Sequence, residues 1–297
     1  MYHVLENFRG RKIGIVGLGY IGNHLFRYLD HFSKEYEFSV LAFNKANSNL
    51  LSGATFDYFF NCAGNTGDFR SKIWSTVDSN LFLARYLMEN IKITECYVSL
   101  SSTRLYGFTS DKNVLFTENS QLTKDGDHLS IDFIYDGTKM LLESILWNYN
   151  NKVDYRISIC RLSNLYGRYN AEDLNDSTYL KVMIRSHVEG KRLLVEQNVL
   201  NTKGYIFIDD AIQGIIHSAI YSEKSDIYNI CSGESYSIEN WLKYLKVDYV
   251  IGNSGKPDLH SRNSIAKAVT ELKFKPQYFL NNLEFNKIFQ NGSNKAV

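Results

Sequence analysis

A glycine-rich turn near the start of the chain constrains the fold more than any other feature. Residues 13–16 form a short apolar run, and Gly17, Gly19 and Gly22 follow it. Apolar side chains then recur at helical spacing, at Ile21, Leu25, Phe26 and Leu29. This order predicts a strand, a tight turn and a helix that ends near residue 30.

Strands and helices are expected to alternate as far as residue 162. The apolar runs predict further strands over 38–43, 56–62, 97–100 and 156–162. Helical spacing predicts helices over 74–91 and 134–149. Such alternation is typical of a parallel sheet with helices on both faces, so the expected fold class is α/β, a doubly wound parallel sheet of the Rossmann type.

The connection between the second and third predicted strands is unusually short. Residues 44–55 leave little room for a helix, a strand and another helix. We therefore expect one edge of the sheet to be clipped, with a strand that is absent or very short.

The remainder of the chain is less regular. We expect a first domain over 1–165, to which 204–222 return, and a smaller, partly interleaved α/β lobe over 166–297. The patterns predict further helices and strands, with helices over 179–189, 211–221 and 238–245 and strands over 205–208 and 227–230.

Composition argues against several kinds of partner. The 297 residues carry 33 basic and 32 acidic side chains, a net charge of +1, so no electrostatic footprint for nucleic acid or an anionic membrane is present. The N-terminal segment lacks the pattern of a secretory signal, and a cytoplasmic location is expected. The cysteines are too far apart for a zinc pair or a disulfide framework, so no metal is expected; they are Cys62, Cys96, Cys160 and Cys231.

The glycine spacing points to a dinucleotide. Gly17, Gly19 and Gly22 would permit a tight turn, the approach of a pyrophosphate and close helix packing. A carboxylate that grips the adenosine ribose usually follows the second strand, but here Asn44 and Lys45 stand there. Lys45 could pair with a 2'-phosphate, which favours NADP, or could be a solvated surface lysine, which leaves NAD open.

A phenol, an ammonium and a hydroxyl suggest redox chemistry on a carbinol. Tyr135 and Lys139 are four residues apart on a predicted helix, hence on one face, where the ammonium would lower the pKa of the phenol. Such a pair is usually surface decoration. Ser102, however, follows a predicted central strand, where ligands bind in doubly wound sheets, so Tyr135 is a plausible proton donor or acceptor.

These three motifs, in this order, resemble an extended short-chain dehydrogenase/reductase of the NAD-dependent epimerase/dehydratase family, over about residues 12–280. Residues 61–64 and 161–167 also resemble family segments beside the cofactor and the substrate. The resemblance implies catalytic roles for Ser102, Tyr135 and Lys139. The cofactor contacts implied or expected are Gly17, Gly19, Tyr20, Ile21, Gly22, Asn44, Lys45, Ala63, Gly64, Asn80, Tyr135, Lys139 and Leu162. The substrate contacts are Thr103, Asn164, Lys203 and Arg262.

The resemblance also limits the reaction. Dehydratases of this family carry two acidic or acid-like residues after the catalytic hydroxyl, whereas this chain has Thr103 and Arg104 there. Without a carboxylate to protonate a departing hydroxide, 4,6-dehydration is disfavoured. The segment that begins at Lys203 usually opens with a phosphate-binding arginine, for which a lysine can act as a point charge.

The resemblance implies an NAD(P)-dependent oxidoreductase for a nucleotide-linked hexose. A 4-ketoreductase that consumes NADPH is favoured by Asn44 and Lys45, and an epimerase that retains bound NAD is the alternative. A non-catalytic dinucleotide-sensing protein is a rival of another class, and the intact Ser102, Tyr135 and Lys139 argue against it. The family further implies a homodimer through the helices near 74–91 and 134–150.

Overall fold

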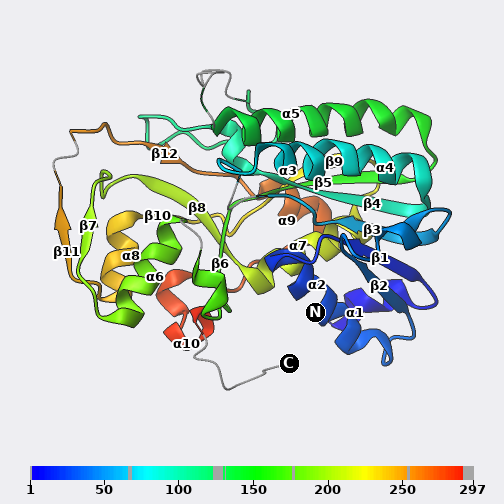
Figure 1. Cartoon of the computed structure of the whole chain (residues 1–297), viewed down its shortest axis with the longest axis horizontal. Helices are drawn as coiled ribbons and strands as arrows, with labels where there is room; N and C mark the ends of the chain where they lie inside the picture. Colours follow the sequence, from blue (N-terminus) through cyan, green and yellow to red (C-terminus); the bar gives the residue numbers. More distant parts are fainter. Residues whose placement is uncertain are drawn as a thin grey trace.

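A six-stranded parallel sheet forms the centre of the computed structural model (Figure 1). The structure describes residues 2–65, 69–122, 130, 132–175, 178–252 and 255–289. The strand order is β2-β1-β3-β4-β5-β9, and every neighbouring pair is parallel. The strands are β1 (Lys12–Val16), β2 (Ser39–Phe43), β3 (Thr55–Asn61), β4 (Lys92–Ser102), β5 (Arg156–Leu162) and β9 (Asp226–Ile230).

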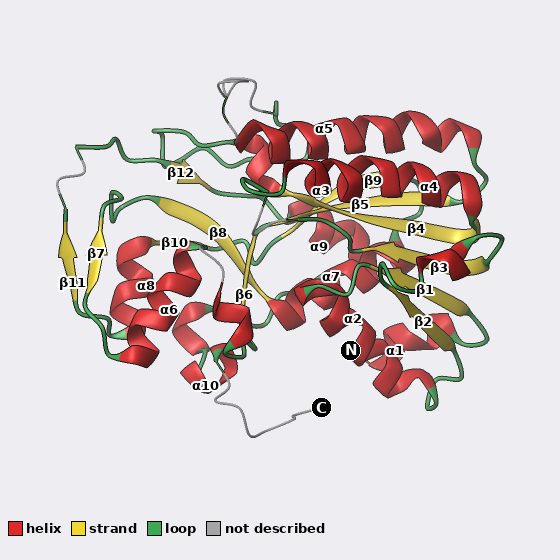
Figure 2. Ribbon diagram, viewed as in Figure 1, coloured by secondary structure: helices red, strands yellow, loops and turns green. Residues whose placement is uncertain are grey.

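Helices cover both faces of this sheet (Figure 2). On one face lie α2 (Tyr20–Ser33), α7 (Ile208–Tyr221) and α9 (Ala266–Leu272), and on the other lie α3 (Ile73–Val77), α4 (Leu83–Asn90) and α5 (Asp132–Tyr149). Alternate residues of each strand enter two separate apolar clusters, one under each helical layer. Strands buried on both faces read as continuous apolar runs, and the predicted α/β fold class is confirmed.

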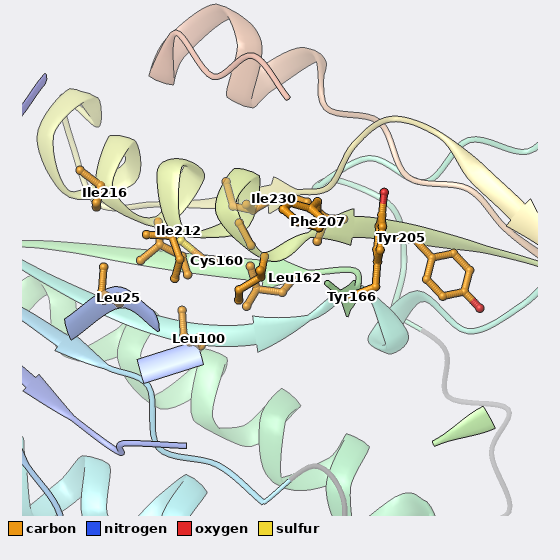
Figure 3. Packing of buried hydrophobic residues seen from close by; sticks show 14 of the residues in the cluster. Leu25, Leu100, Cys160, Leu162, Tyr166, Tyr205, Phe207, Ile212, Ile216 and Ile230 are labelled. Carbon is orange, nitrogen blue, oxygen red and sulfur yellow. The ribbon is translucent and has the colours of Figure 1, made fainter. Parts of the chain in front are cut away.

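Helix α7 packs on the sheet through a buried apolar layer. Ile212 and Ile216 of α7 point down onto Leu100, Cys160 and Leu162 of the neighbouring strands β4 and β5 (Figure 3). All five side chains are buried. Burial of each such side chain contributes on the order of 2 kcal/mol, so α7 belongs energetically to the sheet.

The edge of the sheet at β2 is shortened, as the sequence predicts. Strand β2 is the edge strand, and between it and β3 the chain forms turns and a short 3-10 helix, Ser48–Leu51. Residues 44–54 add no strand to the sheet. Leu51 is buried in the second apolar cluster, so this short connection still contributes to the core.

The helix predicted over 74–91 is interrupted by a wider turn. Residues Asp78–Phe82 form a π-helical turn between α3 and α4. Such turns are frequent at functional sites. Asn80 lies in this turn and is fully buried.

A smaller group of elements lies beside the carboxyl ends of the sheet strands (Figure 1). Strand β8 (Thr202–Phe207) is its centre and pairs with three short strands: β6 (Asn164–Tyr166), β10 (Ser235–Ser237) and β12 (His260–Ser261). The remaining elements are α6 (Tyr179–Glu189), α8 (Ile238–Leu245), α10 (Phe285–Ile288) and the pair β7 (Leu193–Val195) and β11 (Tyr249–Ile251). Among the described residues, no helix has both the length and the apolar character needed to cross a membrane.

A buried polar network fastens α5 to the sheet. Arg161 on β5 and Glu143 on α5 form a bidentate ion pair, in which Nη2 lies 2.6 Å from Oε2 and Nε lies 3.0 Å from Oε1. Both side chains are at least 94% buried. Ser101 on β4 donates to the same carboxylate at 2.5 Å, and Arg161 Nη1 donates to the hydroxyl of Tyr106 at 2.8 Å. One carboxylate therefore joins a helix and two strands.

Removal of one partner of the Arg161–Glu143 pair should destabilise the fold, because the other charge stays buried and unpaired. We expect Glu143→Ala to lower the free energy of unfolding by about 3–5 kcal/mol, because the Arg161 guanidinium stays buried without its counter-ion. The exposed pair of Arg85 and Glu89 provides the control, and Glu89→Ala should cost less than about 1 kcal/mol. Urea unfolding measures the free energy of unfolding of both variants. Equal losses would show that the buried ion pair contributes no more to stability than the exposed pair.

Candidate active site

The predicted site residues lie at the carboxyl ends of the sheet strands. Val16 is in register with Asn61, and Ser102 is in register with Leu162. The carboxyl ends of β1, β3, β4 and β5 therefore lie side by side. This edge is where open α/β sheets bind ligands.

The glycine turn after β1 is built to admit a pyrophosphate. Gly17 has φ +88°, and a Cβ there would lie 2.4 Å from the Ala63 nitrogen. A Cβ at Gly22 would lie 2.0 Å from the Gly17 oxygen, whereas at Gly19 nothing lies within 4 Å. Gly17 and Gly22 thus pack against protein, and Gly19 faces open space at the start of α2, where helix N–H groups favour an anion. These residues fit a dinucleotide.

The next two residues of the turn differ in their surroundings. The Tyr20 hydroxyl donates to the Gly167 carbonyl oxygen, and its ring stacks on Tyr169 at 5.2 Å. Ile21 packs against the apolar cluster under α7. Tyr20 therefore links the turn to the segment that follows β6.

The residues after β2 are exposed and contain no carboxylate. Asn44 Oδ1 accepts the backbone N–H of Ala46 at 2.8 Å, which closes a local turn. Lys45 is exposed. The preference between NAD and NADP that we infer from these two residues stays a prediction.

Three predicted residues converge at the end of β3. A Cβ on Gly64 would lie 3.4 Å from Lys139 Nζ and 3.5 Å from Asn80 Oδ1. Asn80 Nδ2 donates to Thr138 Oγ1 at 2.9 Å, while its Oδ1 is buried without a hydrogen-bond partner. Ala63 donates its N–H to Asn61 Oδ1 at 3.1 Å, which fixes the loop before Gly64. The buried Asn80 oxygen and the Lys139 ammonium therefore both lie beside Gly64, at the carboxyl ends of the strands.

The phenol of Tyr135 meets the hydroxyl of Ser102. Tyr135 and Lys139 lie one turn apart on the buried face of α5. A hydrogen bond joins the Tyr135 phenol and the Ser102 side chain. Lys139 Nζ donates to the Leu100 carbonyl oxygen at 2.8 Å, two residues before Ser102 on β4. The three predicted catalytic side chains are therefore brought to one place.

The expected acidification of Tyr135 is wrong for this structure. Burial raises the pKa of the Tyr135 phenol to about 12, and the Ser102 hydrogen bond opposes this only in part. The Phe69 ring packs on Tyr135 with the centroids 5.3 Å apart, which removes water from the phenol. Burial also lowers the pKa of the Lys139 ammonium to about 8. The phenol is thus protonated at neutral pH.

Two residues that the sequence analysis did not place in the site border the phenol. The Phe69 ring packs on it in a tilted arrangement, and the Arg104 Cζ lies 5.9 Å from the Tyr135 ring centroid. Arg104 follows Ser102 by two residues, and that spacing is a usable signal for its place beside the phenol. Phe69 has no sequence signal of this kind. Glu143 lies one turn beyond Lys139 on the same helical face, and that spacing could have identified it.

Three of the predicted substrate residues, Thr103, Asn164 and Lys203, lie at or near β4 and β8. Thr103 is buried in the turn after β4. Asn164 Nδ2 donates to the Gly204 carbonyl oxygen at 2.9 Å, which places it beside Lys203 on β8. Burial and the nearby charge of Arg104 lower the pKa of Lys203. Lys203 therefore lies within electrostatic reach of Arg104, two residues after Ser102. The substrate roles of Thr103, Asn164 and Lys203 stay predictions.

Arg262 lies apart from the catalytic side chains. Its Nη1 donates to the Lys112 carbonyl oxygen at 3.1 Å. It lines a groove of about 320 Å³ with Thr202, Ser235 and His260, and none of the three predicted catalytic residues contributes to that lining. A substrate role for Arg262 stays a prediction.

Comparison with protein families gives an independent result. The model of the NAD dependent epimerase/dehydratase family matches residues 13–231. This span runs from β1 to the end of β9 and includes the glycine turn, Ser102, Tyr135 and Lys139.

Solved structures with a similar fold cover most of the chain. MoeE5 in complex with UDP-glucose and NAD is 16% identical, with a TM-score of 0.71 over 91% of this chain and 94% of that chain. UDP-glucuronic acid 4-epimerase from Bacillus cereus, with UDP-glucuronic acid and NAD, is 20% identical, with a TM-score of 0.68 over 91% and 96%. RMD from Pseudomonas aeruginosa, complexed with NADPH, is 18% identical, with a TM-score of 0.71 over 91% and 93%.

The glycine turn permits a test that separates folding from binding. We expect Gly22→Ala to destabilise the fold by about 1–3 kcal/mol, because its Cβ meets backbone. Gly19→Ala should leave the melting temperature unchanged and weaken NAD(P)H binding at least about tenfold, or 1.4 kcal/mol, because its methyl group enters the space left for the pyrophosphate. Thermal melts and cofactor fluorescence titration measure the two effects. Unaltered affinity of Gly19→Ala would contradict the assignment.

Proposed function

Because the chain belongs to the NAD-dependent epimerase/dehydratase family, we propose that it is an NAD(P)-dependent oxidoreductase that acts on a nucleotide-linked hexose at C4. The observation that carries the proposal is the meeting of Ser102, Tyr135 and Lys139 beside a glycine turn that fits a dinucleotide. A hydroxyl, a phenol and an ammonium at the carboxyl ends of β4 and its neighbours suit the reduction of a ketone or the oxidation of an alcohol.

The proton path follows from the side chains. Tyr135 gives its phenolic proton to the sugar oxygen as that oxygen gains negative charge. Ser102 donates a hydrogen bond to the same oxygen and holds it beside the phenol. Lys139 would hold a ribose hydroxyl of the cofactor. When bound, the nicotinamide supplies or accepts the hydride at the sugar carbon.

A 4-ketoreductase is the form of this reaction that we favour. The absence of a carboxylate at Asn44 and Lys45 removes repulsion against the 2'-phosphate of NADPH. RMD from Pseudomonas aeruginosa, a structural neighbour, binds NADPH.

An epimerase that retains NAD is the second candidate. The neighbours include UDP-glucuronic acid 4-epimerase with bound NAD. In that reaction Tyr135 would first accept a proton and later return it. The same three side chains serve both reactions, so the cofactor and the product distinguish them.

A nucleotide-linked substrate suits the surroundings of Lys203. The exposed Asn164 contacts β8 at Gly204, and Lys203 of that strand lies within electrostatic reach of Arg104. An ammonium and an amide are suitable partners for a diphosphate. Two of the neighbours bind UDP-glucose or UDP-glucuronic acid, and we extend the class of substrate, not the individual sugar, to this chain.

The catalytic assignment can be tested with purified protein. Tyr135→Phe should lower turnover of 4-keto nucleotide sugars with NADPH or NADH by at least about 100-fold, with the cofactor affinity unchanged. Tyr149→Phe, at the end of the same helix, is the matched control and should retain activity. Mass spectrometry of copurified ligands and spectrophotometric assays provide the measurements.

The outcomes separate the candidates. Stoichiometric consumption of NADPH supports the reductase. Firmly held NAD, inversion at one carbon and no net cofactor turnover would replace it with the epimerase. Full activity of Tyr135→Phe on an accepted substrate would overturn both.

We also propose a homodimer through the outer helical layer. Helices α3 and α5 lie side by side on the outside of the molecule (Figure 1). Large apolar side chains on this layer are exposed, namely Trp74 at 75%, Phe82 at 57%, Leu141 at 49%, Ile145 at 42% and Trp147 at 51%. Several large exposed apolar side chains on one helical layer are typical of a protein interface.

Charge on this layer should dissociate the dimer. We expect Leu141→Glu combined with Ile145→Glu to yield a folded monomer, because two carboxylates would be buried in an apolar interface. Leu194→Glu, at an apolar position on β7 that is 58% exposed, is the control and should leave the dimer intact. Sedimentation velocity gives the mass. A wild-type protein that sediments as a monomer would refute the interface.

A further inference from the structure

Arg104 occupies an unusual position in the candidate site. Its Cζ lies 5.9 Å from the centroid of the Tyr135 ring and 5.7 Å from that of Phe69. The two rings pack on each other, so the guanidinium lies along an aromatic pair that ends at the phenol. The Arg104 side chain is 36% exposed. A cation therefore lies beside the proposed proton donor, at the open side of the pair.

Neighbouring carboxylates hold this guanidinium in place. Arg104 Nε donates to Asp136 Oδ1 at 2.8 Å, and Nη2 donates to Asp132 Oδ2 at 3.2 Å. Asp132 also accepts from Arg70 Nε at 2.6 Å. Asp136 follows Tyr135 directly on α5, so the helix that presents the phenol also anchors the cation. Two guanidinium and two carboxylate groups fix the geometry.

Lys139 directs its charge elsewhere. Its Nζ donates to the Leu100 carbonyl oxygen and lies beside Gly64, at the end of β3. Lys203 on β8 lies within electrostatic reach of Arg104, whose charge lowers the pKa of Lys203. Among the described charged groups near this site, which include Arg70, Asp132, Asp136, Lys139 and Lys203, Arg104 is the cation found over the Tyr135 ring.

We propose that Arg104 is a positioning residue of the proton-transfer site, whose charge stabilises the oxyanion that forms when Tyr135 gives up its proton. The O–H bond of Tyr135 breaks, the proton passes to the sugar oxygen, and the phenolate left behind faces the Arg104 guanidinium until solvent returns a proton. The inference rests on the proposed role of Tyr135 and adds a residue to it.

The electrostatics of the site agree with this geometry. The positive charge of Arg104 lowers the pKa of Tyr135, whereas the negative charge of Asp136 raises it. Arg104 and Asp136 are partners in one ion pair, but their charges act on the phenol in opposite directions. Because the two charges have opposite effects on the pKa of Tyr135, removing each charge in turn distinguishes an electrostatic role of Arg104 from a structural one.

The test measures the ionisation of residue 135 directly. A fluorotyrosine is placed at position 135 of the full chain, and its 19F shift is followed against pH. A fluorinated phenol has a lower pKa than tyrosine, so it titrates at a pH at which the fold is intact. We expect Arg104→Gln to raise this pKa by about 0.5–1 unit and Asp136→Asn to lower it by a similar amount. Arg104→Lys, which retains the charge, should stay closer to the parent than Arg104→Gln.

Several outcomes overturn the proposal. Both neutral variants break the same ion pair, so shifts in the same direction would show that the pair is only structural. Absence of a shift in Arg104→Gln would show that the guanidinium does not act on the phenol. Thermal melts confirm that each variant is folded, and if Arg104→Gln unfolds, the comparison of Arg104→Lys with Asp136→Asn decides.

The readout does not depend on the reaction. The titration needs no substrate, so it stands even if the proposed reductase activity fails. Where turnover is observed, the pH profile of kcat provides a second measurement. Its Tyr135 limb should move to higher pH in Arg104→Gln and to lower pH in Asp136→Asn, because the ionisation that limits turnover is that of Tyr135.

Discussion

The position of Tyr135 depends on one buried carboxylate. Glu143 receives the bidentate guanidinium of Arg161 and the hydroxyl of Ser101. Tyr135 and Lys139 lie on the same helix as Glu143, and Ser102 follows Ser101 on β4. The contact that holds the helix to the sheet therefore also sets how far the phenol lies from the strand that carries the hydroxyl. Packing and chemistry share this constraint.

The fold was largely predictable because the strands of a parallel sheet are recognisable one at a time. Apolar runs and the glycine turn identified the central strands and the short connection after residue 43. Strand β4 is longer than predicted, since its first residues, from Lys92, alternate between exposed and buried and lack a continuous apolar run. The π-helical turn around Asn80 has no pattern that a helical period would reveal.

The residues that meet in the site were predictable from the sequence, but the direction of the pKa shift of Tyr135 was not. Spacing on one helix was enough to bring Tyr135 and Lys139 together, and the strand end was enough to add Ser102. The surroundings of the phenol come from residues far apart in the chain, since α3, α4 and β4 separate Phe69 from Tyr135 in the sequence. Desolvation by such neighbours determines the pKa, and so the sign of the shift could not be read from Lys139 alone.

The polar network under the site also reaches the smaller group of elements. Tyr106 donates its hydroxyl hydrogen to Asn229 Oδ1 at 2.7 Å, and Asn229 Nδ2 donates to the Ser264 carbonyl oxygen at 3.2 Å. Hydrogen bonds thus cross the floor between the sheet and the segment after β12. A rotation of the smaller group of elements against the sheet would have to break these hydrogen bonds together. The contacts that support the floor of the site therefore also resist such a rotation.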